Sequence, residues 1–255
     1  MEDEVYRVLY EVEDRHWWFR GRRAIVWALL ERAGVRGPLR LLDAGCGTGR
    51  HLLEYGVLGE AHGIDPSPAA VEACHRRGLE GVRQAPIERL PYADASFDLI
   101  LATDVLEHVP DDVVALRELR RVAAPGATIL CTVPALTWLW SDEDVRLHHH
   151  RRYRRGELVA RMRETGWEPS IATYYNTLLL PAIAVARKLR RAAAPGTAAR
   201  SEMERSSGPL TAALIAPLRL EAALIGRGLR LPIGVSVGLV ARAAQPYLRE
   251  IAAAD

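Results

Sequence analysis

The chain has 255 residues, of which 49% are hydrophobic and 26% are charged, and this composition is typical of a globular protein long enough for one large core. It excludes collagen-like, disordered and disulfide-scaffold proteins. The net charge is only +2, from 34 lysines and arginines against 32 aspartates and glutamates, so electrostatics give no case for a nucleic-acid-binding protein.

Three features of the chain predict a reducing, cytoplasmic setting. The three cysteines are few, odd in number and not in metal-ligand spacing. The acidic segment over residues 1–14 lacks the basic and then apolar pattern of a secretion signal. No uninterrupted apolar run reaches the roughly 18 to 20 residues that a membrane-spanning helix requires.

The first predicted helix covers residues 22–33 and ends at Gly34. Its apolar residues, among them Ile25, Val26 and Leu29, have helical spacing. A mixed aromatic and basic stretch over 16–20 precedes it. We expect the helix to flank the core and the stretch to lie before the helix.

Residues 38–133 alternate short β-type runs with helical stretches, which is the pattern of a parallel sheet with crossover helices. The predicted strands cover 39–43, 60–65, 81–87, 97–103 and 127–133. The predicted helices between them cover 50–55, 69–77 and 111–122. The pattern predicts a doubly wound α/β core.

Beyond this core the pattern predicts a helix over 154–165, a strand over 167–176 and a buried last strand over 234–242. Two apolar and then basic segments, 177–191 and 210–230, predict helices joined by a small-residue stretch over 192–208 that we expect to be flexible. We therefore expect one domain over 1–255, with an N-terminal segment over 1–37, a core over 38–176, a helical insertion over 177–232 and the last strand over 233–242.

A glycine-rich turn follows the first predicted strand. It reads Asp43-Ala44-Gly45-Cys46-Gly47-Thr48-Gly49, and Asp65 ends the second strand, 20 residues after Gly45. Glycines here let the backbone approach a ligand closely, and the acid can accept hydrogen bonds from both ribose hydroxyls of an adenosine cofactor. A nicotinamide fingerprint, G-x-G-x-x-G, would need glycine where the chain has Arg50.

Asp43 decides between the adenosine cofactors. A carboxylate at the mouth of this turn repels the doubly negative pyrophosphate of a dinucleotide, whereas the sulfonium and ammonium groups of S-adenosylmethionine are cationic. A charge-assisted hydrogen bond contributes about 1.5 to 3 kcal/mol. The turn therefore favours S-adenosylmethionine, and a nicotinamide-dependent oxidoreductase is the alternative enzyme class.

These motifs resemble those of the class I S-adenosylmethionine-dependent methyltransferases, in the type 11 group that is similar to quinone-biosynthesis methyltransferases. The resemblance covers residues 39–133 and includes the glycine turn with Asp65, the runs Leu90-Pro91-Tyr92 and Ser96-Phe97-Asp98, and Val105-Leu106-Glu107-His108-Val109. It implies a Rossmann-like, doubly wound sheet of seven mostly parallel strands with the last one antiparallel. We expect an N-terminal helical lid and a helical insertion before the last strand.

The resemblance also implies the cofactor site. Asp43, Gly45 and Gly47 would line the methionine end, and Asp65 would bind the ribose. The other implied cofactor residues are Ile64 and Pro66 at the adenine faces, Ile87 and Glu88 near the adenine, Trp18 and Arg23 in a lid that also includes Trp17 and Arg20, and Thr103 and His108 at the fourth strand. Many relatives have an aspartate two residues before the position of Glu88, where this chain has Pro86.

Methyl transfer from a sulfonium is an in-line displacement, which needs alignment, exclusion of water and a place for a proton. Candidates lie at the carboxyl ends of the strands. We choose His149 as the acid/base residue, and His108 as a second candidate that could instead pack over the cofactor or cap the next helix. The adjacent histidines 148–150 have no acid or cysteine at a supporting spacing, so we predict no metal.

The predicted acceptor-binding residues are Trp140, Arg151, Arg152 and Tyr153. Seven arginines and one acid lie over residues 146–163, and arginine forks suit phosphate or carboxylate, which favours an anionic acceptor. A solvated helix face is the alternative explanation for some of them. Trp140 could floor an acceptor pocket or seal the core.

The helical insertion distinguishes this chain from a minimal enzyme of the class. Its apolar, arginine-flanked helices could roof a hydrophobic acceptor pocket, bury against a second subunit or rest on an anionic membrane. We favour the roof and a homodimer contact over peripheral membrane contact, because Pro181 and Pro217 break long amphipathic faces.

The sequence predicts a methyltransferase that uses S-adenosylmethionine as cofactor and a small-molecule or lipid-like acceptor in bacterial biosynthesis. Besides the oxidoreductase, two hypotheses stay open. One is an S-adenosylmethionine-binding protein without methyl transfer, and the second is a protein that uses the sulfonium only as electrostatic support for a different reaction. The acceptor and the methylated atom stay open as well.

Overall fold

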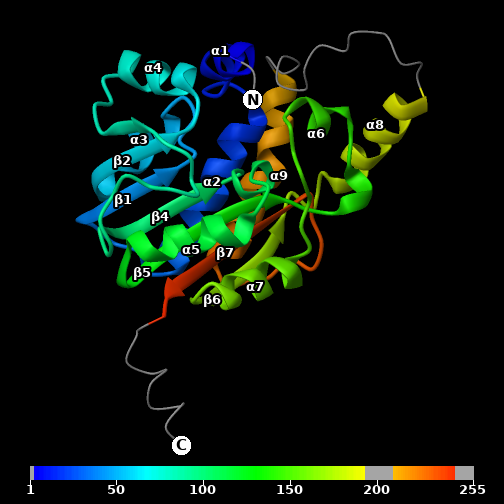
Figure 1. Ribbon diagram of the computed structural model, residues 1–255. Helices are drawn as coiled ribbons and strands as arrows, with labels where there is room; N and C mark the ends of the chain where they lie inside the picture. Colours follow the sequence, from blue (N-terminus) through cyan, green and yellow to red (C-terminus); the bar gives the residue numbers. More distant parts are fainter. Residues whose placement is uncertain (1–2, 193–208, 245–255) are drawn as a thin grey trace, which may run out of the picture.

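The computed structural model describes residues 3–192 and 209–244 and contains a seven-stranded sheet in the order β3-β2-β1-β4-β5-β7-β6 (Figure 1). Neighbouring strands are parallel from β3 to β5, whereas β7 runs antiparallel to both β5 and β6. The strand order reverses between β1 and β4, which is where ligands bind in such sheets. The predicted doubly wound, mostly parallel sheet is confirmed.

The strands of this sheet are β1 Leu39–Ala44, β2 Gly59–Asp65, β3 Val82–Gln84, β4 Phe97–Thr103, β5 Ala123–Pro134, β6 Trp167–Tyr175 and β7 Ser236–Ala243. Each predicted strand is present. β3 has three residues instead of seven, because only Val82 to Gln84 pair with β2 and Pro86 has no N–H to donate to the ladder. β5 is longer than predicted and begins at Ala123 instead of residue 127.

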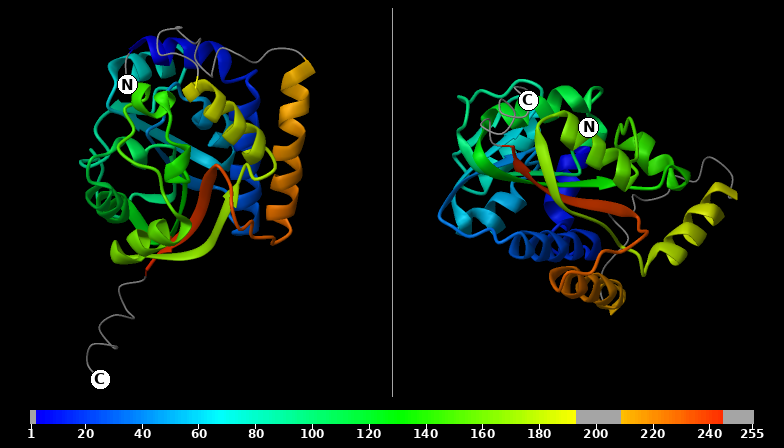
Figure 2. Two further views of the ribbon diagram at one scale, coloured as in Figure 1. Left: turned by 90° about the vertical axis from the view of Figure 1, so that its right-hand side faces the viewer. Right: turned by 90° about the horizontal axis from the view of Figure 1, so that it is seen from below.

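The described helices are α1 Asp3–Val12, α2 Trp17–Arg32, α3 Arg50–Tyr55, α4 Pro68–Arg76, α5 Asp112–Val122, α6 Asp142–Arg146, α7 Arg155–Glu164, α8 Leu180–Ala192 and α9 Pro209–Gly226, with short 3-10 helices η1 Gly56–Leu58, η2 Leu106–His108 and η3 Thr137–Leu139. Helices cover both faces of the sheet (Figure 2). Residues of α5 and α7, among them Leu119 and Met162, pack on one face. Residues of α2, α3 and α9, among them Leu29, Tyr55 and Ile225, pack on the other.

The N-terminal region differs from the prediction in two ways. α2 begins at Trp17 instead of residue 22, because His16 Nδ1 accepts a hydrogen bond from the backbone N–H of Trp18 at 3.2 Å and caps the helix. The prediction that the aromatic stretch lies before the helix is therefore wrong, since the stretch forms the first turn. α1, which we did not predict, precedes it.

The helices α8 and α9 lie between β6 and β7, where the insertion was predicted. α9 packs along α2, where Leu218 approaches Gly21 so closely that a Cβ at this glycine would lie 2.2 Å from Leu218 Cδ1. The stretch over 192–208, predicted to be flexible, lies outside the described residues from 193 onward. Among the helices of the described ranges, none is both long enough and apolar enough to cross a bilayer.

Candidate active site

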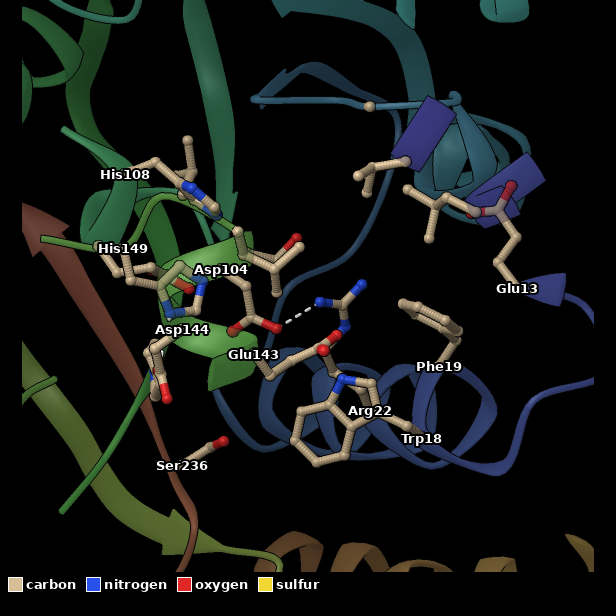
Figure 3. A pocket seen from close by; sticks show the side chains of 18 of the residues that line it. Glu13, Trp18, Phe19, Arg22, Asp104, His108, Glu143, Asp144, His149 and Ser236 are labelled. Atoms are coloured by element: carbon tan, nitrogen blue, oxygen red, sulfur yellow. Dashed lines mark hydrogen bonds and ion pairs between the residues drawn. The ribbon is translucent and has the colours of Figure 1, made fainter. Parts of the chain in front are cut away.

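A cavity of about 690 Å³ lies at the carboxyl ends of the central strands. Its walls come from α1 and α2, the glycine turn after β1, the segments that follow β4 and β5, and α8. Figure 3 shows Arg22 of α2 reaching across the cavity toward Asp104, which lies on the wall that also carries His108 and His149. This volume is within the range of small-molecule sites.

Asp65 ends β2 and organises the glycine turn. Its Oδ2 accepts from the backbone N–H of Gly47 at 2.9 Å, and its Oδ1 accepts from the N–H of Ser67 at 2.9 Å and from the hydroxyl of Tyr6 at 3.2 Å. Gly45 has a φ of +79°, and a Cβ there would lie 2.6 Å from Val105 Cγ2. Gly45, Gly47, Asp65 and the adjacent Pro66 all line the cavity. The turn therefore has the open backbone that an adenosine ligand requires.

Asp43 lies behind this turn and not at its mouth, so its predicted position is wrong. The side chain is fully buried, it is not among the cavity-lining residues, and neither carboxylate oxygen has a hydrogen-bond partner. Burial raises the pKa of Asp43 to about 7, although the nearby Arg22 guanidinium acts in the opposite direction. An unpaired buried carboxyl beside a cavity is stabilised as an anion by a cationic ligand, so Asp43 fits the charge of S-adenosylmethionine.

Of the two adjacent arginines of α2, Arg22 lines the cavity and Arg23 does not. Arg22 forms an ion pair with Asp104, and both side chains are largely buried. Arg23 lies on another face of α2, where its Nε is 2.8 Å from Glu54 Oε2 and its Nη1 donates to the carbonyl of Glu13 at 3.0 Å. Neighbouring positions on a helix differ by about 100° in direction, which explains the difference. Trp18, one turn before Arg22, also lines the cavity, and its role in a lid over the cofactor stays a prediction.

Sequence reasoning missed α1 as part of the site. Val5, Tyr6 and Leu9 of this helix line the cavity beside the glycine turn. Glu13, just after α1, accepts from the hydroxyl of Thr48 and pairs with Arg77, so it ties the helix to the turn. Apolar residues at spacings of one and four positions were the available signal for this amphipathic helix.

His149 lines the cavity and is held by a buried acid. Its Nδ1 lies 2.9 Å from Oδ1 of Asp144, and the same carboxylate accepts from Arg152 at 2.8 and 2.9 Å. Burial acts to raise the pKa of Asp144, but these interactions outweigh it and hold the pKa well below its usual range. Asp144 is thus a permanent anion that orients His149 toward the cavity.

His108 stands next to His149, with ring centroids 4.7 Å apart. Burial, with a smaller contribution from His149, lowers the pKa of His108 to about 4, so this imidazole is neutral at pH 7. Ligand atoms of Glu107, His108 and His149 lie within 4.8 Å of one another, and Glu107 is buried with one carboxylate oxygen unpaired. The structure therefore supplies the acid that the sequence spacing lacked. Three ligands are one fewer than a structural zinc site uses, and the absence of a metal stays a prediction.

Three predicted acceptor residues have partners within the protein. Tyr153 is fully buried, and its hydroxyl donates to Asp112 at 2.6 Å and to the carbonyl of Leu106 at 3.2 Å. Arg151 lies 3.1 Å from the same Asp112, and Arg152 is buried against Asp144. Of the three only Arg152 lines the cavity.

The remaining predicted residues divide between the cavity and the protein body. Thr103 lines the cavity, with its Oγ1 3.0 Å from His51 Nδ1. Ile87 is buried in the core, Glu88 is half-buried, and neither lines the cavity. Trp140 is half-buried beyond η3 and does not line it either.

The chain matches the family model of a methyltransferase domain over residues 42–131. A malonyl-[acyl-carrier protein] O-methyltransferase from Halorhodospira halophila is 34% identical over 180 residues, which are 65% of this chain and 57% of that protein. A demethylmenaquinone methyltransferase from Staphylococcus aureus is 34% identical over 116 residues, which are 42% of this chain and 48% of that protein. The chain thus spans about half the length of the curated relatives it matches.

The fold is also found among solved structures. An S-adenosylmethionine-dependent methyltransferase from Thermotoga maritima superposes with a TM-score of 0.56 at 18% sequence identity, covering 93% of this chain and 99% of that one. This likeness covers much more of the chain than the segment of the family match. It is evidence for the fold.

Proposed function

We propose that this chain, which carries the domain and the fold of the class I S-adenosylmethionine-dependent methyltransferases, methylates a small-molecule or lipid-like acceptor in bacterial biosynthesis. The observation that carries the proposal is that the Asp65 turn and the His149–Asp144 pair line one cavity. One side suits an adenosine cofactor and the other suits an acceptor that loses a proton. The three cysteines are free and buried, which supports a cytoplasmic location.

The cofactor side uses residues with fitting chemistry. Asp65 has oxygens for the ribose hydroxyls, and Gly45 and Gly47 leave room for the ligand against the backbone. The charge of Arg22 acts on Asp43, and Arg22 lines the cavity, where a ligand carboxylate would compete with Asp104 for it. When bound, S-adenosylmethionine supplies an electrophilic methyl group on a cationic sulfur.

The acceptor side has an apolar wall next to His149 and other polar residues. The wall is lined by Leu179 just before α8, Ile183 of α8, Leu214 of α9 and Val235 before β7, and these side chains exclude water from the reacting atoms. Because Nδ1 of His149 bonds to Asp144, the proton on that nitrogen leaves Nε2 as the acceptor of a proton from the substrate. Arg151 and Arg152 are paired with acids, so our proposal for the acceptor depends on the apolar wall and not on these arginines.

Calorimetry tests the cofactor. We expect micromolar binding of S-adenosylmethionine and of its demethylated product, and none of NADH. Asp65→Ala should weaken both adenosyl ligands by about tenfold or more, because it removes charge-assisted hydrogen bonds. Asp98→Ala is the matched control, since Asp98 pairs with Arg40 near the amino end of β4, opposite the cavity. NADH binding without S-adenosylmethionine binding would refute the proposal in favour of an oxidoreductase.

Product analysis separates an enzyme from a binding protein. The protein is incubated with S-adenosylmethionine and a panel of phenols, isoprenoid acids and sugars, and methylated products are detected by mass spectrometry. We expect turnover of an apolar member of the panel. Tight cofactor binding with no product from any member, including lipid extracts, would favour a binding protein without methyl transfer.

A further inference from the structure

Two helices, α6 and α8, border one part of the cavity. Asp144 and Leu147 line it from the side of α6, and Ile183 and Arg187 line it from α8. Arg187 also donates a hydrogen bond to the carbonyl of Leu139 in η3, so α8 and the segment after β5 touch. Figures 1 and 2 show α8 extending away from the body of the protein beside α6.

Large apolar side chains of η3, α6 and α8 are exposed. Trp138 of η3 is 55% exposed, Val145 of α6 is 62%, and Val185 and Leu189 of α8 are 58% and 66%. We call these four residues the apolar rim. Single exposed apolar residues are ordinary, whereas several on neighbouring segments mark an interaction surface.

Among the described residues, Val185 and Leu189 give α8 an exposed apolar side. Within the described residues, its contacts with the core involve its first turns, where Leu180 and Ile183 pack with Leu139 and Val235. Pro181 lies in the first turn of α8, so it does not interrupt the helix from residue 182 onward, and Pro217 lies in α9. The reason that the sequence offered against a membrane contact therefore does not apply to α8.

The positive charge of α8 favours an anionic partner. Its sequence contains four basic residues, Arg187, Lys188, Arg190 and Arg191, and no acidic residue. On the neighbouring α6, Asp142 is exposed and Glu143 pairs with Arg146. The apolar rim supplies exposed apolar groups, one of them a tryptophan, and α8 supplies positive charge. This combination is typical of helices that lie in the interface of an anionic bilayer.

We propose that the apolar rim and α8 seat the protein on an anionic lipid surface, with the cavity mouth facing the bilayer. The apolar cavity wall then continues into the hydrocarbon boundary, so a lipid acceptor reaches His149 without crossing water. A second copy of the chain fits this surface less well, because a twofold contact would bring one α8 against the other with like charges. The inference depends on the proposed function only for the lipid-like acceptor.

The test is flotation with lipid vesicles, without S-adenosylmethionine. Wild type should float with vesicles of equal parts phosphatidylglycerol and phosphatidylcholine, and much less with phosphatidylcholine alone or in high salt. Lys188→Glu should weaken binding by about fivefold for each unit of charge changed. Val185→Asp with Leu189→Asp should weaken it by about tenfold or more, since both residues would enter the interface.

The matched control is Val57→Asp. Val57 is 77% exposed on η1, which precedes β2 and so lies at the opposite end of the strands from the cavity. This variant should float like wild type, and thermal melts should show that all variants fold.

Failure of wild type to float, or flotation unaffected by the α8 substitutions, would overturn the proposal. A dimer in sedimentation velocity that Leu189→Asp dissociates, with no vesicle binding, would assign the surface to a second copy. Cofactor affinity is measured separately, so either proposal can fail alone.

Discussion

The imidazole of His149 and the carboxylate of Asp144 form a hydrogen-bonded pair, with Nδ1 2.9 Å from Oδ1. The carboxylate is itself fixed by Arg152, which binds both of its oxygens, and by the backbone N–H of Ser141 at 2.8 Å. A fixed acid gives the imidazole one tautomer and one orientation. The pair therefore has the form of a general base, in which Asp144 is a positioning residue.

Replacement of His149 should affect turnover and spare cofactor binding. We expect His149→Gln to lower kcat by about 10² to 10⁴, the usual contribution of a general base, for an acceptor that loses a proton. Calorimetry should give an unchanged affinity for S-adenosylmethionine. His75→Gln on the exposed surface of α4 is the control and should keep full activity. Intact turnover in His149→Gln would show that the acid/base assignment is wrong.

Replacement of Asp43 should stabilise the protein without ligand and weaken the binding of S-adenosylmethionine. The folded-state pKa of about 7 lies above the ordinary value of 3.8, so ionising Asp43 at pH 8 destabilises the native state. Asp43→Asn should raise the free energy of unfolding at pH 8 by about 2 to 4 kcal/mol. The same substitution should weaken S-adenosylmethionine binding by about tenfold or more.

The pH dependence supplies the control for Asp43. At pH 5.5 the folded wild type keeps this carboxyl protonated, whereas the unfolded chain, with its ordinary pKa of 3.8, still ionises it. The penalty relative to Asn is therefore about half of its size at pH 8. Urea unfolding at the two pH values should therefore show a stability gain that shrinks on acidification. A gain of equal size at both values would contradict the assigned pKa.

Two glycines of the turn should respond differently to alanine. Gly45 combines a positive φ with a Cβ position only 2.6 Å from Val105 Cγ2, whereas a Cβ at Gly47 would have its nearest neighbour at 3.8 Å. Gly45→Ala should cost about 2 to 4 kcal/mol of stability, and Gly47→Ala about 1 to 2 kcal/mol from backbone strain alone. Urea unfolding measures both. Addition of Val105→Ala should recover part of the loss at Gly45 and none at Gly47.

The sheet could be predicted because its local signals agree with its packing. β1, β4 and β5 are buried on both faces and appear in the sequence as continuous apolar runs bounded by turns. α3 has the bounds that the pattern predicts. α1 and the start of α2 were not predicted, because His16 caps α2 through a ring nitrogen and histidine is a weak cap signal.

The site could be predicted only where the backbone motif determines it. The turn places Gly45, Gly47 and Asp65 together through hydrogen bonds that follow from strand register. Which side chains outside the motif face the cavity depends on packing, so Arg22 took the position expected for Arg23, and Tyr153 became a core residue bonded to Asp112. A count of arginines gives no information about the acids that will pair with them.

His108 should make the protein acid-sensitive. Its pKa is about 4 in the folded state and near 6.5 in the unfolded chain, so the unfolded state binds more protons between these values and stability falls as pH falls. From pH 7 to 5 this one group should remove about 2 kcal/mol. Burial lowers the pKa of His51 as well, so wild type should lose more stability than this amount.

Urea unfolding of variants isolates the contribution of His108. His108→Asn should lose about 2 kcal/mol less than wild type over the same pH interval. His75→Asn, at the exposed end of α4, should lose as much as wild type. Equal losses in wild type and His108→Asn would mean that His108 is not held neutral by burial.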